Sequence, residues 1–321
     1  MTIVDEGLAV PTGRPADTLA PEPRRNRSVR GRAQTLASLT FLGPNLLMVL
    51  LFLVVPLVWA FVLSFQKLES IGPAQYAGIN NYVDLFRDSR FYETLFNTVV
   101  FTVLTVPVGM AIGLGIAVLL NGVLPGRVLF RSIIFLPLVI SGVSTGLLGA
   151  WMFDQYNGFV NKFLEIFGVT GPDWQSNGNW AMISVVLMTL WQRIGFDMLI
   201  YLAGLQALSP ELLEAATIDG ATPWQRFRSV VVPLLGPSTF FLLVMNLIYS
   251  FQIFDTVYAM TAGGPNYSTT FLVTYAYRAG FDEKGAGELG YAATIGVVIF
   301  LITLLITTLQ WRTSKNRDQV G

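Results

Sequence analysis

Cysteine and histidine are absent from this chain of 321 residues. Their absence excludes disulfide bonds, zinc sites built from Cys and His, cysteine nucleophiles and the Ser-His-Asp arrangement of hydrolases. Charged residues are also scarce, at 12% of the chain, against about 25% in soluble domains. Their formal net charge is zero, which gives no electrostatic support for binding nucleic acid.

Apolar residues are what the chain has in abundance. Hydrophobic types make up 53% of the sequence, and a soluble core of this size would leave more apolar surface than so few charges can cover. The composition therefore predicts an integral membrane protein.

Six segments are long and apolar enough to cross a bilayer, which takes about 20 residues of helix. They lie near residues 40–65, 94–120, 128–152, 181–207, 234–260 and 289–311. The predicted fold class is an all-α integral membrane protein with six transmembrane helices. The predicted parts are a flexible N-terminal tail without a signal-peptide cleavage site (1–37), the membrane domain (38–313) and a C-terminal tail (314–321).

Lys and Arg are concentrated in the tails and in the connections that would share a side with the N-terminus. By the positive-inside rule this predicts a multi-pass protein of the cell membrane with both termini in the cytoplasm. The outer connections, 66–93, 153–180 and 261–288, are rich in aromatic residues, Asn and Gly. They suit either contact with an extracytoplasmic partner or ordered caps on the helices.

Two spans carry small or hydroxyl side chains in a pattern. Gly109, Gly113 and Ala117 recur every four residues, which predicts a helix face that a neighbouring helix approaches closely. Ser141 and Ser144, with Thr145 beside them, either line a polar path or bond back to the carbonyls of their own helix.

The stretch SPELLEAATIDGATPWQRFRSVVVP, residues 209–233, is a charged insert on the predicted cytoplasmic side. Ser209 before a proline is typical of a helix start, and Gly220 is typical of a sharp turn. Thr222 and Gln225 stand at capping-box spacing for a second helix, and Pro233 is expected to close it. The stretch therefore predicts a compact helix-turn-helix.

The insert is also amphipathic, with an apolar stripe formed by Trp224, Phe227 and Val231. A helix pair resting on lipid headgroups would favour cations, whereas this one carries the carboxylates of Glu211, Glu214 and Asp219. A rigid surface that docks on another protein fits this pattern better.

This pattern resembles the EAA loop of permease subunits of binding-protein-dependent ABC importers. The family's motif, E-A-A, three residues, G, nine residues and I-x-L-P, is matched in register by Glu214, Ala215, Ala216, Gly220, Val230, Val232 and Pro233, with Val in place of the Ile and Leu. The flanking stretches, 191–216 and 251–281, resemble the maltose- and glycerol-phosphate-type carbohydrate permeases in particular.

The resemblance implies a second, homologous permease subunit, two cytoplasmic ATPase subunits and an extracytoplasmic substrate-binding protein as partners. The insert would be gripped by an ATPase, with Glu214 as its anchor and Gly220 as its turn. The residues assigned to this contact are Glu214, Ala215, Ala216, Asp219, Gly220, Trp224, Phe227 and Pro233. The chain has no GxxxxGK[ST] loop, so we expect no catalytic residue, metal or cofactor in it; ATP and Mg would belong to the ATPase.

Ionisable residues inside predicted spans indicate a functional path. Arg193 and Asp197 are four residues apart and either pair within their helix or line that path. The fifth span adds amides, hydroxyls and an aromatic ring, which suit a polyhydroxylated ligand. The assigned path residues are Trp191, Arg193, Asp197, Asn246, Tyr249, Ser250, Gln252 and Asp255.

A single path cation favours a neutral di- or oligosaccharide, and a glycerol-phosphate ester is the alternative. A stand-alone secondary transporter is a further hypothesis, although the sequence shows no repeated halves. A membrane-embedded enzyme ranks last, because the chain offers few groups for acid-base chemistry.

Overall fold

The computed structural model of the chain describes residues 40–68, 73–122, 124–282 and 288–318. The predicted N-terminal tail, 1–37, and residues 319–321 lie outside this part. The chain divides into two units, Met1–Pro56 and Leu57–Gly321. The described residues of the first unit are helical and include a π-helical turn, η1 (Leu50–Val54).

Four of the six predicted spans are confirmed as long apolar helices. They are Thr40–Leu63, which ends in α2 (Val55–Leu63), α4 (Ser89–Asn121), α8 (Gly178–Gln206) and Leu289–Arg312, the apolar part of α15 (Leu289–Asp318). Each is long and apolar enough to cross a membrane, because an α-helix rises about 1.5 Å per residue.

The third predicted span is not one straight helix. It consists of α5 (Arg127–Val139) and α6 (Gly142–Met152), which meet at an angle of 99°. The Ser141 hydroxyl caps α6 by accepting from the backbone N–H of Ser144 at 3.2 Å. Ser141 therefore starts a new helix, a role that neither sequence-based interpretation of these hydroxyls anticipated.

The fifth predicted span is interrupted as well. Helix α12 (Gly236–Gln252) ends where Ile253 turns to an extended conformation, and α13 (Asp255–Thr261) begins two residues later. At its other end α12 meets the helical stretch Pro223–Leu234 at 63°. The described residues therefore hold four straight candidate spans, or six if each bent pair counts as one.

The described residues of the connections predicted to be outer include regular secondary structure. They contain a pair of two-residue antiparallel strands, with Gln66 opposite Tyr76, and short helices. The elements are β1 (Gln66–Lys67), β2 (Gln75–Tyr76), α3 (Asn80–Arg87), α7 (Phe159–Ile166), α14 (Leu272–Tyr277) and the π-helical turn η3 (Arg278–Asp282).

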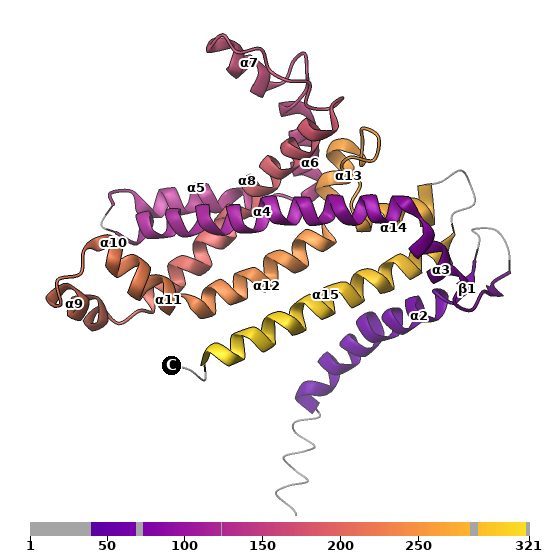
Figure 1. Ribbon diagram of the computed structural model, residues 1–321, viewed down its shortest axis with the longest axis horizontal. Coiled ribbons are helices and arrows are strands. Elements are labelled where there is room, and N and C mark those ends of the chain that lie inside the picture. Colours follow the sequence, from indigo (N-terminus) through magenta and orange to yellow (C-terminus); the bar gives the residue numbers. More distant parts are fainter. Residues whose placement is uncertain (1–39, 69–72, 123, 283–287, 319–321) are drawn as a thin grey trace, which may run out of the picture. The chain divides into compact units, whose positions relative to one another are not determined.

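Helices α4 and α8 lie side by side (Figure 1) and pack through the predicted small face of α4. A Cβ added at Gly113 would lie 2.5 Å from the Cβ of Asp197. Only hydrogen fits there, so glycine sets the separation of the two helices. Beside this contact, Met198 and Leu202 of α8 are buried in the core.

Helix α6 packs against α13 in the same way. A Cβ at Gly146 would lie 2.5 Å from the Thr256 carbonyl oxygen, and one at Gly142 would lie 2.9 Å from the Cβ of Asp255. These glycines bring the second half of the third span onto the short helix that follows α12, and so position the wall of the site.

Candidate functional site

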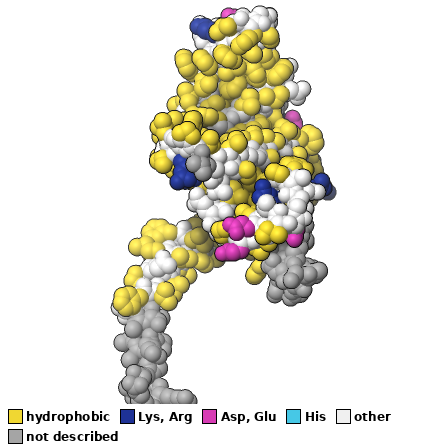
Figure 2. All heavy atoms as spheres, turned by 90° about the vertical axis from the view of Figure 1, so that its left-hand side faces the viewer, with side chains coloured by type: hydrophobic (Ala, Val, Ile, Leu, Met, Phe, Trp, Pro, Cys, Tyr) yellow, Lys and Arg dark blue, Asp and Glu magenta, His cyan; other side chains and the backbone are white. Residues whose placement is uncertain are grey.

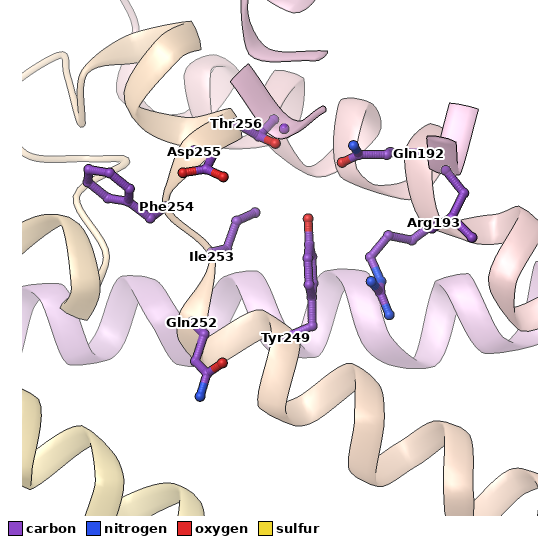
Figure 3. Close-up of a pocket in the computed structure, with 10 residues that line it drawn as sticks. Gln192, Arg193, Tyr249, Gln252, Ile253, Phe254, Asp255 and Thr256 are labelled. Carbon is purple, nitrogen blue, oxygen red and sulfur yellow. The ribbon is translucent and has the colours of Figure 1, made fainter. Parts of the chain in front are cut away.

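A polar cavity of about 250 Å³ opens where α5, α6 and α8 meet the break after α12 (Figure 3). Its wall combines amide, hydroxyl and charged groups with an aromatic ring, because the break exposes side chains that a continuous helix would point elsewhere. It is lined by Leu138, Gly142, Gln192, Arg193, Tyr249, Gln252, Ile253, Phe254, Asp255 and Thr256.

Arg193 and Tyr249 form one side of this cavity. The guanidinium carbon of Arg193 lies 3.9 Å from the centre of the Tyr249 ring, a cation–π contact between α8 and α12. The same two residues also line a smaller cavity of about 20 Å³, together with Thr189, Asp197 and Asn246. The two cavities therefore share these two residues in their walls.

Arg193 and Asp197 are linked through Asn246. The Asn246 side chain accepts from Nη2 of Arg193 at 3.1 Å and donates to Oδ1 of Asp197 at 2.7 Å. Asp197 is 2% exposed and Asn246 is 6% exposed, so the hydrogen bond between them is shielded from water. The hydrogen bond from the half-buried Arg193 is partly shielded. The interhelical bridge through α12 takes the place of the direct intrahelical pair that the four-residue spacing suggested.

Seven of the eight assigned path residues line one of the two cavities. Trp191 lines neither, and its side chain is 41% exposed, so its assignment as an aromatic surface for the ligand is not supported. Ser250 reaches only the smaller cavity, where its hydroxyl accepts from Thr102 at 3.0 Å and donates to the Leu247 carbonyl.

Gln192, Phe254 and Thr256 are cavity residues that the sequence reasoning missed. Gln192 had a detectable signal, because it lies three residues after Thr189, on the same side of the helix, and directly before Arg193. Phe254 and Thr256 had none, since they reach the cavity only because α12 breaks at Ile253.

The insert at 209–233 folds as the predicted helix-turn-helix. It comprises α9 (Pro210–Ile218), the turn at Gly220 with φ of 81°, and a second helical stretch formed by α10 (Pro223–Arg226), η2 (Phe227–Val231) and α11 (Val232–Leu234). The capping box between Thr222 and Gln225 is present. Ser209 occupies the N-cap of α9, but its hydroxyl donates to the Glu211 carboxylate instead of capping the backbone.

A further hydrogen bond fixes the two helices of the insert to each other. Nη1 of Arg226 donates to the Thr217 hydroxyl at 2.7 Å, so the second stretch is tied to α9 across the turn. Pro233 does not close the element, because the helix continues to Leu234 and bends at Leu235.

The assigned residues of the insert are mostly solvent-exposed, among them Glu214, Ala215, Asp219, Gly220 and Pro233. Trp224 is 67% exposed, and its ring centre lies 5.6 Å from that of the half-buried Phe227. Figure 2 looks onto the end that carries α9 and α10, and acidic and basic side chains lie there below a broad hydrophobic surface. The insert thus presents a rigid, accessible surface.

In the described part of the chain, no group of three or more His, Cys, Asp or Glu side chains is placed to hold a metal ion. The site offers hydrogen bonding, charge and an aromatic face. Together with several helices long and apolar enough to cross a membrane, such a polar cavity indicates a membrane transport protein.

Comparison with known proteins narrows the class. Residues 86–315 match the family described as "Binding-protein-dependent transport system inner membrane component". The sulfoquinovosyl glycerol transport system permease of Agrobacterium fabrum is 34% identical over 285 residues, which cover 88% of this chain and 92% of that protein. The sn-glycerol-3-phosphate transport system permease of Yersinia pestis is 34% identical over 271 residues, which cover 84% and 90%.

A solved structure has the same fold. A subunit of a bacterial ABC transporter for import of alginate superposes with a TM-score of 0.79 at 24% sequence identity, over 90% of this chain and 99% of that one. The chain belongs to the family of inner-membrane permease components of binding-protein-dependent transport systems. It is a transport subunit of an ABC importer, not an enzyme.

Proposed function

We propose that this chain is one of two permease subunits of an importer that moves a neutral di- or oligosaccharide into the cytoplasm. An extracytoplasmic binding protein delivers the saccharide, and two ATPase subunits supply the energy. The observation that carries the proposal is the cavity of about 250 Å³, whose wall combines the amides of Gln192 and Gln252 with the ring of Tyr249.

The chemistry of the wall suits a sugar. A saccharide presents many hydroxyl groups, each able to donate and accept, around a ring with apolar C–H faces. Amide and hydroxyl side chains match the first feature, and an aromatic ring matches the second. The cavity is smaller than the ~300–1,000 Å³ of typical ligand pockets, and we propose that a second permease subunit completes it.

The charges of the wall favour a neutral ligand over an anionic one. Arg193 is the cation of the cavity, and its charge is offset by Asp197 through Asn246. Asp255 adds a carboxylate to the same wall. A phosphate or sulfonate entering this half of the path would therefore meet more negative than positive charge.

A glycerol-phosphate ester is the second candidate, and the relatives named for sn-glycerol 3-phosphate favour it. The proteins of Y. pestis and A. fabrum that are 34% identical to this chain are named for sn-glycerol 3-phosphate and sulfoquinovosyl glycerol. An anionic substrate on this path would need cations from the partner permease in addition to Arg193.

The helix-turn-helix at 209–233 is the proposed coupling element. Each ATPase would grip one such insert, so that closure of the ATPases on ATP moves the permease helices. The capping box at Thr222 and the Arg226–Thr217 hydrogen bond support this role, because only a stiff element transmits force. Glu214 is exposed and would pair with an ATPase cation. With the insert on the cytoplasmic side, both termini of the chain would lie in the cytoplasm as well.

Isolation and reconstitution test the proposal. The chain is expected to copurify with a second permease and ATPase subunits, and the complex in proteoliposomes to take up maltose, trehalose or cellobiose only with ATP and binding protein. Uptake of sn-glycerol 3-phosphate alone would favour the second candidate. Uptake by this chain alone without ATP would overturn the proposal in favour of a secondary transporter.

The coupling role has its own test. Glu214→Lys and Gly220→Asp are expected to leave the complex in the membrane but to separate ATP hydrolysis from uptake. Wild-type uptake in both variants would show that the insert does not couple ATP hydrolysis to transport.

A further inference from the structure

The connection at 153–180, predicted to be outer, contains a small folded unit built around Trp174. The indole N–H of Trp174 donates to Oδ1 of Asn161 at 2.7 Å, and Nδ2 of Asn161 donates to the Gln155 carbonyl at 3.0 Å. Asn161 and Trp174 are both 6% exposed. Because Asn161 belongs to α7, these hydrogen bonds fix one side of that helix.

The packing around Asn161 leaves α7 little freedom to rotate. A Cβ added at Gly171 would lie 2.0 Å from Oδ1 of Asn161, so the backbone touches this side chain directly. Val160 and Leu164 of α7 pack on the buried cluster to which Trp174 belongs. The directions in which the remaining sides of α7 point are therefore fixed as well.

A second side of α7 is apolar and exposed. Phe159, Phe163 and Ile166 recur at i, i+4 and i+7, and Phe167 follows at i+8, so all four lie along one side of the helix. Their side chains are 56%, 49%, 76% and 68% exposed. The ring of Phe163 lies 6.2 Å from that of Phe159 and 5.2 Å from that of Phe167, centre to centre. These four residues form one continuous surface, the α7 apolar stripe.

The third side of α7 carries its charges. Lys162 and Glu165 are both exposed, and they cancel in net charge. A helix with an apolar side beside a charged, water-accessible side is typical of a helix that lies at the boundary between membrane and water. Because the charges cancel, the association of α7 with a membrane would depend on apolar area and not on attraction to anionic lipid.

The helices on either side of this connection carry exposed apolar stripes of their own. The stripes are Val143, Leu147 and Trp151 on α6 and Trp180, Ile183 and Leu187 on α8. On helices that cross a membrane, such side chains are suited to contact lipid chains. Each stripe has its tryptophan at the end next to the connection, and tryptophan is enriched at the boundary between membrane and water. The chain therefore enters and leaves the connection at two positions that mark this boundary.

We propose that the α7 apolar stripe inserts into the outer leaflet of the surrounding membrane, where phospholipid headgroups meet the acyl chains. Figure 1 shows α7 beyond the end of α6 and away from α12 and α15, so those helices do not cover it. A soluble partner that docks and leaves in every transport cycle needs hydrogen bonds across its interface, and the stripe offers only carbon atoms. The inference depends on the membrane location of the chain and not on the transported ligand.

A single introduced cysteine tests the contact, because the chain has no cysteine of its own. Phe163→Cys on the apolar stripe and Glu165→Cys on the charged side are each labelled with the fluorophore bimane. The full importer, with any cysteines of its other subunits replaced, is placed in nanodiscs of phosphatidylcholine. Quenching is measured with phosphatidylcholine brominated in its acyl chains and, separately, with iodide in the water.

The expected result is a reversal between the two quenchers. Brominated phosphatidylcholine should quench the label at position 163 at least about twofold more than the label at position 165, and iodide should do the opposite, because the two positions face lipid and water. Should Phe163→Cys fail to assemble, Phe159→Cys reports on the same stripe. Equal quenching of the stripe label and the position 165 label by both agents would overturn the inference.

Other occupants of the stripe give different results. A label at position 163 that iodide quenches until the extracytoplasmic binding protein is added would assign the stripe to that protein. A label shielded from both quenchers without binding protein would assign it to another subunit of the importer. Either outcome overturns the inference. Quenching by brominated lipid should be unchanged when anionic phosphatidylglycerol is added to the nanodiscs, and quenching that appears only with phosphatidylglycerol would contradict a contact driven by apolar area.

Discussion

Arg193 lies against the face of Tyr249, with 3.9 Å between the guanidinium carbon and the ring centre. The contact joins α8 to α12, and both residues line both cavities. It also orders a long cationic side chain that would otherwise be free to sample many rotamers.

The ring of Tyr249, rather than its hydroxyl, is expected to position Arg193. Tyr249→Phe should keep the cation–π contact and retain most of the uptake, whereas Tyr249→Leu should lose about 0.5–2 kcal/mol of interaction and reduce uptake several-fold. Uptake by reconstituted importer measures both. Equal loss in the two variants would assign the role to the hydroxyl.

Asn246 is expected to be needed for stability because it bonds to the buried carboxylate of Asp197 and to the half-buried guanidinium of Arg193. Asn246→Ala leaves Arg193 and Asp197 without this bridge, and hydrogen bonds to charged groups are worth about 1.5–3 kcal/mol each. The unfolding midpoint of the detergent-solubilised importer should fall by several degrees. Asn179→Ala, at an exposed position in the first turn of α8, is the control and should not move the midpoint.

The glycine face of α4 provides a matched pair of substitutions. A Cβ at Gly113 would lie 2.5 Å from Asp197 Cβ, whereas one at Gly115 would meet nothing within 4 Å. Gly113→Ala should destabilise the protein by about 1–3 kcal/mol through overpacking, and Gly115→Ala should be neutral or slightly stabilising. Thermal unfolding in detergent compares the two, and equal effects would contradict the close approach of α4 and α8.

At Gly220 the effect of backbone conformation can be measured apart from the effect of side-chain size. Its φ is 81°, and an added Cβ would meet nothing within 4 Å, so the cost of substitution comes from the backbone. Gly220→Ala should cost about 1–2 kcal/mol in the insert, and Gly220→Asn less, because Asn tolerates left-handed geometry. The ratio of sugar transported to ATP hydrolysed should therefore fall further in Gly220→Ala than in Gly220→Asn. Identical ratios in the two variants would contradict this explanation.

The hydrogen bond between Arg226 and Thr217 predicts a similar loss of coupling when it is removed and the turn is left unchanged. Thr217→Val keeps the shape of the side chain and removes the acceptor of the 2.7 Å hydrogen bond. The two helices of the insert should then be held less rigidly, and the same coupling ratio should fall, while Thr217→Ser should retain it. Wild-type coupling in the Val variant would show that the turn and capping box suffice.

Local sequence signals predicted those parts of the fold that local interactions determine. Long apolar runs placed α4, α8 and the apolar part of α15 to within a few residues, and the Thr222–Gln225 spacing predicted a capping box that is present. Ser141 at the start of α6 belongs to the same class of signal, but it stands inside a stretch long enough for one span, which favoured an uninterrupted helix.

The break after α12 was not predictable in this way. No proline or glycine stands at the break, at Ile253 and Phe254. We attribute the end of the helix to the packing of α13 on the glycines of α6, a contact between segments about 110 residues apart in the chain. The bridging role of Asn246 has the same origin. Spacing identified Arg193 and Asp197 as partners on one helix, but only the packing of α12 on α8 brings an amide between them.

The glycine-mediated packing of α6 on α13 has a mechanical consequence. Each helix follows a break, α6 after Ile140 and α13 after Ile253, and the contact leaves no room for side chains between them. Because the two helices are in direct contact, we expect α6 and α13 to move together as one body, with backbone rotation at Ile140 and at Ile253. This wall of the cavity is then expected to move as a unit and not as two independent segments.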